Sequence, residues 1–122
     1  MNRTELLELH KSTCQAGYDI MMAKNADYTG GNEGDDPFAN FRATEMLGVP
    51  AEIGVLTRCL DKFQRIKAFV NNGTLAVKSE SVDDAIEDVI NYMVLLKGII
   101  VERREAERDA GFDEMEAEVE GG

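Results

Sequence analysis

The sequence predicts an all-α domain, a helical bundle of three long helices with a long loop between the first two. Apolar residues recur at steps of three and four positions over long stretches, which is the spacing of one face of an α-helix. Only two prolines occur, so the chain lacks the frequent turns of an all-β domain. Its 122 residues and 43% hydrophobic content suit one domain with one core.

The first helix is expected to begin after Thr4, whose hydroxyl suits an N-cap, and to run to about Lys24. Residues spaced by three and four positions predict its core-facing side: Leu7, His10, Cys14, Tyr18 and Met21. Residues 29–37 are rich in glycine and aspartate and predict an irregular loop. A short helical turn is expected over residues 43–47, ended by Gly48.

The second helix is expected over residues 50–70, because Pro50 suits the first helical position and Gly73 suits the backbone conformation that ends a helix. Its core-facing side is predicted at Ile53, Leu56, Cys59, Leu60, Phe63 and Ile66. Ser81 is expected to cap a third helix that continues through Ile100. The core-facing side of this helix is predicted at Val82, Ala85, Ile86, Val89, Ile90, Met93, Leu96 and Ile100.

The net charge of −11 disfavours duplex nucleic acid as a direct partner, because proteins bind phosphate backbones with clustered Lys and Arg. The acidic excess is uneven, since the segment 102–120 has nine acids and three bases. We therefore divide the chain into a domain of residues 1–101 and an acidic C-terminal extension of residues 102–122.

Composition also limits the location and the chemistry. No segment has the roughly 18–20 uncharged apolar residues of a membrane span, and the first residues lack the apolar part of a secretory signal. Two cysteines and one histidine are too few for a disulfide framework or for most zinc sites. We expect a cytoplasmic protein without a membrane partner.

A stripe of acidic and amide residues lies beside the apolar side of the third helix. Like charges four positions apart on a helix repel each other, so a positive group is expected opposite this stripe. Either divalent cations or basic side chains of another helix would meet this need. The stripe consists of Glu80, Asp84, Glu87, Asp88 and Asn91.

The second helix has a polar stripe of its own, formed by Arg58, Asp61, Lys62 and Arg65. In one interpretation the two stripes form salt bridges between the helices. In the other they form a metal and phosphate site, because carboxylates one turn apart can bind Mg²⁺ while Arg and Lys bind phosphate oxygens. The spacing leaves both interpretations open.

Amide and aromatic side chains flank the glycine-rich loop. Asn25, Asp27 and Tyr28 precede it, and Asn40 and Phe41 follow it. Such side chains suit a nucleobase, by hydrogen bonds to its edge and by stacking on its face. Alternatively, Asn25 caps the first helix and the phenylalanines anchor the loop to the core.

Five blocks occur in this order along the chain, namely residues 25–28, 36–42, 58–66, 80–84 and 88–92. They read Asn-Ala-Asp-Tyr, Asp-Pro-Phe-Ala-Asn-Phe-Arg, Arg-Cys-Leu-Asp-Lys-Phe-Gln-Arg-Ile, Glu-Ser-Val-Asp-Asp and Asp-Val-Ile-Asn-Tyr. The ordered set resembles the phage and prophage family called nucleotide modification associated domain 1, over roughly residues 15–96. That family is similar to the MazG-like all-α nucleoside triphosphate pyrophosphatases.

The resemblance implies Mg²⁺-dependent cleavage of a (deoxy)nucleoside triphosphate to a monophosphate and pyrophosphate, with Mn²⁺ as a substitute ion. It also implies a homo-oligomer, a dimer or a tetramer, in the cytoplasm of a host cell. The residues assigned on this basis are Asp61, Asp84 and Asp88 for the metal, Glu87 and Asp88 for catalysis, Arg58, Lys62 and Arg65 for the phosphates, and Asn25, Asp27, Tyr28, Asn40, Phe41 and Asn91 for the base or sugar.

Two other functions stay open at the level of sequence. The second helix lacks the Glu-Glu-x-x-Glu that is usual in the MazG-like enzymes, which favours a protein that binds a nucleotide or cyclic nucleotide without cleaving it. Such a protein would sequester its ligand or assist base modification. A third interpretation keeps both stripes as salt bridges and makes the protein part of an assembly.

Overall fold

The computed structural model describes the chain except residues 30–35, 75–80 and 122, and it describes no side chain in 26–35, 75–80 or 112–122. Its elements in order are α1 (Arg3–Thr29), α2 (Ala39–Arg42), the 3₁₀ helix η1 (Ala43–Leu47), α3 (Ala51–Asn72) and α4 (Val82–Gly121). The described residues include no strand, so the all-α prediction is confirmed.

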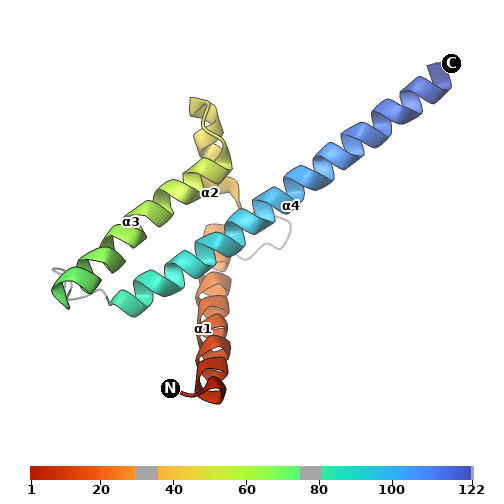
Figure 1. Cartoon of the computed structure of the whole chain (residues 1–122). Coiled ribbons are helices and arrows are strands. Elements are labelled where there is room, and N and C mark those ends of the chain that lie inside the picture. Colours follow the sequence, from red (N-terminus) through yellow and green to blue (C-terminus); the bar gives the residue numbers. More distant parts are fainter. Residues whose placement is uncertain (30–35, 75–80, 122) are drawn as a thin grey trace.

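Helices α3 and α4 form an antiparallel hairpin, and α1 crosses α4 rather than running alongside the hairpin (Figure 1). Two ion pairs between the helices, one near the middle of α3 and one at its start, fix the register of the hairpin. Lys62 of α3 pairs with Asp88 of α4 at 3.0 Å, and Glu52 pairs with Arg103 at 2.8 Å. The C-terminal part of α4 extends beyond the hairpin (Figure 1).

The core of the hairpin is small. Val55 and Cys59 of α3 are almost completely buried, and Ile99 of α4 packs in the same cluster. Phe38 and Phe41 complete this cluster from the segment before α3. Burial raises the pKa of the Cys59 thiol, because the charged thiolate is less stable away from water.

The predicted core-facing side of α3 is largely wrong. Ile53, Leu56, Leu60 and Phe63 are exposed, and only Cys59 of the predicted set is fully buried. The helix is rotated because its polar edge also faces α4, where Lys62 pairs with Asp88. This rotation leaves one apolar side of α3 uncovered within the chain.

The predicted core-facing side of α1 is also largely wrong, since Leu7, His10, Cys14 and Tyr18 are exposed and only Met21 of the predicted set is partly buried. The helix meets α4 at Gly17, whose carbonyl accepts a hydrogen bond of 3.1 Å from the Asn91 amide. A Cβ atom at Gly17 would lie 2.9 Å from Asn91 Oδ1, so the close approach requires glycine there.

The N-terminus of α1 also differs from the prediction. Asn2, not Thr4, is its N-cap, because Asn2 and Glu5 each accept a hydrogen bond from the other's backbone N–H. The helix continues to Thr29, beyond the predicted end at Lys24. Asn25 therefore lies within the helix and does not cap it.

The other helix ends follow local chemistry. Gly48 ends η1 and Gly73 ends α3, both in the left-handed conformation, with φ of 76° and 75°. Pro50 directly precedes α3, one position outside the helix rather than inside it. The Ser81 hydroxyl accepts a 3.0 Å hydrogen bond from the Asp84 N–H and caps α4 as predicted.

The segment before α3 is fixed on α4. Phe38 lies against Gly98, where an added Cβ would be 2.6 Å from the end of its ring. Arg42 pairs with Asp36 at 2.6 Å and also with Glu102. Because α4 continues without a break through residue 102, these contacts join the first turn of the acidic extension to the rest of the chain.

None of the described helices combines the length and apolar character needed to cross a membrane.

We expect Gly98→Ala to lower the free energy of unfolding by about 1–3 kcal/mol, because the new methyl group would displace the buried Phe38 ring. Gly111→Ala is the matched control on the same helix, since nothing lies within 4 Å of a Cβ there. That change should stabilise the protein by about 0.5–1 kcal/mol through helix propensity alone. Denaturant unfolding of the two variants measures both effects, and equal stability changes would contradict the Phe38 contact.

Candidate functional site

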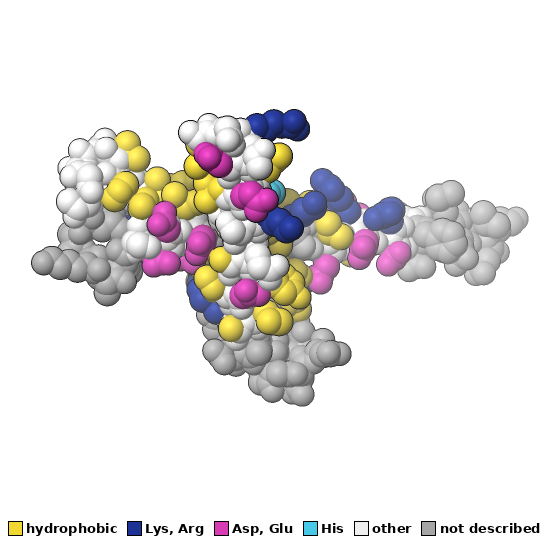
Figure 2. All heavy atoms as spheres, turned by 90° about the horizontal axis from the view of Figure 1, so that it is seen from below, with side chains coloured by type: hydrophobic (Ala, Val, Ile, Leu, Met, Phe, Trp, Pro, Cys, Tyr) yellow, Lys and Arg dark blue, Asp and Glu magenta, His cyan; other side chains and the backbone are white. Residues whose placement is uncertain are grey.

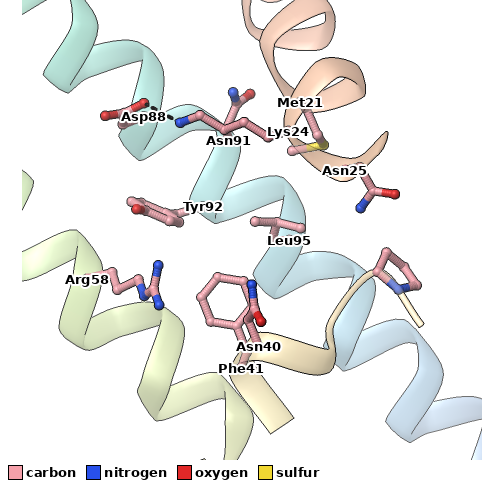
Figure 3. Close-up of a pocket in the computed structure, with 11 residues that line it drawn as sticks. Met21, Lys24, Asn25, Asn40, Phe41, Arg58, Asp88, Asn91, Tyr92 and Leu95 are labelled. Carbon is pink, nitrogen blue, oxygen red and sulfur yellow. Dashed lines mark ion pairs between the residues drawn. The ribbon is translucent and has the colours of Figure 1, made fainter. Parts of the chain in front are cut away.

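A cavity lies between α1, α4, α3 and the segment that contains α2 (Figure 3). Each of these four parts of the chain contributes at least one polar side chain. The lining residues are Met21, Lys24, Asn25, Pro37, Asn40, Phe41, Arg58, Asp88, Asn91, Tyr92 and Leu95.

Positive charge is concentrated at this cavity. Among the residues that the structure describes, Lys24 and Arg58 line it with one carboxylate, that of Asp88, and Lys62 adds a further cation next to Asp88. The chain as a whole has a net charge of −11. A local excess of cations on such an acidic chain favours an anionic ligand.

The Asp88 carboxylate lies between two lysines from different helices. Its Oδ2 atom is 3.0 Å from Lys62 Nζ of α3, and its Oδ1 atom is 3.9 Å from Lys24 Nζ of α1. The Lys24 pair is visible in Figure 3. The Asp88 and Lys62 side chains are only 22% and 19% exposed, so their attraction is less screened than that of a surface pair.

The remaining cation, Arg58, lies over an aromatic ring that a second ring supports. The Arg58 guanidinium lies 5.2 Å from the centre of the Phe41 ring, a cation–π distance. Phe41 in turn meets Tyr92 edge to face, with ring centres 6.4 Å apart and an interplanar angle of 89°. Because Phe41 is only 7% exposed, its main role is to anchor the segment before α3 and to support Arg58.

Three amide side chains from different elements surround the cavity: Asn25 of α1, Asn40 of α2 and Asn91 of α4 (Figure 3). The Asn91 Nδ2 group donates its hydrogen bond to Gly17 and so also joins α1 to α4. Amides can donate and accept, and they therefore suit a ligand with mixed hydrogen-bonding groups such as a base or a sugar.

The remaining predicted acids are not gathered around the cavity. Asp61 pairs within α3 with Arg65 at 3.3 Å, and its side chain is 62% exposed. Asp84 is exposed in the first turn of α4, and Glu87 is partly buried. Within the described residues, no group of three or more His, Cys, Asp or Glu side chains is placed to hold a metal ion.

Six of the residues predicted for a nucleotide site line the cavity: Asn25, Asn40, Phe41, Arg58, Asp88 and Asn91. Lys62 adjoins the cavity through Asp88. The Asp27 and Tyr28 side chains lie outside the described residues. Sequence reasoning left Lys24 and Tyr92 out of the site, although each is the direct neighbour of an asparagine that it included.

The salt-bridge interpretation of the two stripes holds in part. One pair, Lys62 with Asp88, joins α3 to α4, whereas Arg65 and Asp61 pair within one helix.

Comparison of the chain with protein-family models, curated proteins and solved structures gives no match.

We expect Asp88→Asn to tighten the binding of inorganic tripolyphosphate in EDTA by on the order of tenfold, because the change removes the carboxylate that neutralises Lys24 and Lys62. Asp83→Asn is the matched control, since it alters the net charge equally at an exposed position of the same helix. Calorimetric titration measures both. Equal gains in affinity would mean that only the total charge matters and would contradict a cationic site at Asp88.

Proposed function

We propose that the protein is a Mg²⁺-dependent (deoxy)nucleoside triphosphate pyrophosphohydrolase that acts on the cytoplasmic nucleotide pool. The single observation that best supports this proposal is the cavity with excess cations on a chain of net charge −11. Amide side chains and a tyrosine border the same cavity, and these suit the base and sugar of an anionic ligand. The proposal includes relation to the MazG-like enzymes, an origin in a phage and a homo-oligomeric state.

Binding of the triphosphate would begin with an exchange of partners. Phosphate oxygens compete with the Asp88 carboxylate for Lys62 and Lys24, and a triphosphate has more negative charge than the single carboxylate. Arg58, oriented by the Phe41 ring, offers a planar group that can bind two phosphate oxygens at once. This exchange would release the Asp88 carboxylate for another cation.

Asp84 and Asp88 are assigned as ligands of a magnesium ion that arrives with the nucleotide. They lie one turn apart on α4, and Mg²⁺ in nucleotide enzymes usually takes one or two carboxylates together with phosphate oxygens and water. Asp61 is assigned as a further ligand. When bound, the ion or its substitute Mn²⁺ neutralises phosphate charge and lowers the pKa of bound water.

The chain's own groups would then perform the hydrolysis. Glu87 is assigned to orient a water molecule and to accept its proton as the water oxygen attacks the α-phosphorus. The bond from that phosphorus to the bridging oxygen breaks, and pyrophosphate leaves with both electrons of the bond. Lys62, Arg58 and Arg65 stabilise the charge of the leaving group.

Recognition of the nucleoside is assigned to the asparagine side chains that line the cavity. Asn25, Asn40 and Asn91 are proposed to bind the base or sugar by hydrogen bonds, with Asp27 and Tyr28 beside them. Phe41 lines the same cavity but is only 7% exposed, so it offers little ring surface for stacking.

A second candidate function is nucleotide binding without cleavage. It is favoured by the separation of the acids, since Asp88 is neutralised by lysines and the described carboxylates form no cluster of three. In this case the same cavity would hold a nucleotide or cyclic nucleotide as a stored ligand or a signal.

Incubation of the protein with each deoxynucleoside triphosphate and Mg²⁺ separates the two candidates. We expect equimolar monophosphate and pyrophosphate from at least one substrate, and no turnover in EDTA. Lys62→Ala should raise KM by about tenfold or more for the triphosphate, because it removes one charge-assisted phosphate contact. Tight binding of a nucleotide by calorimetry without any product would instead select the binding protein.

The magnesium assignment has a separate test in thermal unfolding. A non-hydrolysable deoxynucleoside triphosphate at 100 times its Kd stabilises the native state by about 2.7 kcal/mol, and Mg²⁺ should add to this effect. We expect the Asp84→Asn, Asp88→Asn double variant to lose the added Mg²⁺ effect while keeping its helix content. The Asp83→Asn protein serves again as the control. An undiminished Mg²⁺ response in the double variant would rule out these two ligands.

A further inference from the structure

A groove lies between α1 and α4, next to the cavity. Tyr18 and Met22 line it from α1, Val94 and Gly98 line it from α4, and the Phe38 ring completes it. Figure 2 shows hydrophobic side chains at the surface beside α1, where this helix crosses α4. Tyr18, Met22 and Val94 are 63%, 58% and 53% exposed, so a ligand in the groove would reach them directly.

The groove is continuous with the cavity. Four residues line both of them: Met21, Asn25, Pro37 and Leu95. In Figure 3, Met21 and Asn25 lie across the cavity from Arg58. The groove therefore joins the cavity on the side remote from that cation.

The sizes of the two hollows indicate one extended site. The cavity has a volume of about 80 Å³, and the groove has a volume of about 410 Å³. Sites for ligands of drug size usually measure about 300–1,000 Å³. The cavity alone is thus too small for a whole nucleotide, whereas the cavity together with the groove is large enough.

The two hollows also differ in chemistry. Lys24 and Arg58 line the cavity, while the described side chains that line the groove include no charged group. Asn25 and Tyr18 are the polar side chains among them. A ligand that fits both hollows is therefore an anion at one end and largely apolar at the other, because covering apolar surface is favourable and a phosphate chain alone would leave the groove in water.

The apolar lining favours a purine over a pyrimidine. A purine has two fused rings and so covers more apolar surface, to which the hydrophobic gain is proportional. A pyrimidine has a similar number of polar edge groups on a smaller ring, and a groove with few polar side chains leaves such groups unpaired. The unbranched Met21 and Met22 side chains can adapt to a flat ring and make sulfur–aromatic contacts with it.

We propose that the groove binds the nucleobase and makes the protein selective for purine nucleoside triphosphates. The inference rests on the nucleotide ligand of the proposed function but not on its cleavage. The base lies against Met22 and Val94, the asparagine side chains of the cavity meet the sugar, and the phosphates reach Lys24 and Arg58. Met22 and Val94 are then specificity-determining residues.

Calorimetric titration of the full-length protein in EDTA tests this inference with dATP, dCTP and inorganic tripolyphosphate. We expect dATP to bind at least about tenfold more tightly than either of the other two, because it alone fills the groove with a purine. The Met22→Gln, Val94→Thr double variant should bind dATP about tenfold more weakly and tripolyphosphate as the wild type does, because it keeps the shape of the groove but adds polar groups that the base cannot pair. Lys62→Ala should weaken the binding of both ligands.

Met46→Gln is the matched control, because Met46 is 89% exposed in η1 and lines neither hollow. It should bind all three ligands as the wild type does. Since Met22 and Val94 are already more than half exposed, the double variant should keep the wild-type circular dichroism spectrum.

Unchanged dATP affinity in the double variant would overturn the inference, as would an equal loss for tripolyphosphate. Equal affinities of the wild type for dATP and dCTP would overturn the purine selectivity. Geranyl diphosphate is a further probe, and tighter binding of it than of dATP, with the same dependence on Met22 and Val94, would assign the groove to an alkyl chain instead. Groove-dependent binding of dATP without turnover in Mg²⁺ would support this inference and contradict the proposed hydrolysis.

Discussion

The Asp88 carboxylate accepts ion pairs from two helices, and the rest of the structure is arranged around this contact. Lys62 approaches one carboxylate oxygen from α3 and Lys24 approaches the other from α1. Two lysines therefore meet one carboxylate, Asp88, at one point on α4. The described side chains at this end of the cavity thus have more positive than negative charge. Among the described lining residues, the opposite charge comes from the single carboxylate of Asp88.

The same contact links the site to the outer surface of the hairpin. Since α3 turns Lys62 and Arg58 toward α4 and the cavity, its apolar residues around Leu60 point to the other side. This arrangement leaves one apolar side of α3 uncovered within the chain. The cavity and the exposed apolar side of α3 are thus two consequences of one rotation of that helix.

Helix ends could be predicted from the sequence, whereas helix rotations could not. Gly48, Gly73 and Ser81 act on their immediate neighbours, so local chemistry is sufficient to place them. The rotations of α1 and α3 depend instead on the Gly17–Asn91 and Lys62–Asp88 contacts, which join residues far apart in sequence. An apolar stripe predicts burial but does not say whether the covering surface belongs to the same chain. For the same reason the sequence indicated Asn25, Asn40, Arg58 and Asp88 but not their arrangement around one cavity with Lys24.

A crystal structure with a non-hydrolysable deoxynucleoside triphosphate and Mn²⁺ tests the central claim most directly. The cavity is predicted to hold the triphosphate, with its oxygens within hydrogen-bond distance of Lys62 and Arg58. An anomalous manganese signal is predicted beside Asp84 and Asp88, with Asp88 no longer paired to both lysines. An empty cavity at saturating nucleotide, with the Asp88 ion pairs unchanged, would contradict the account.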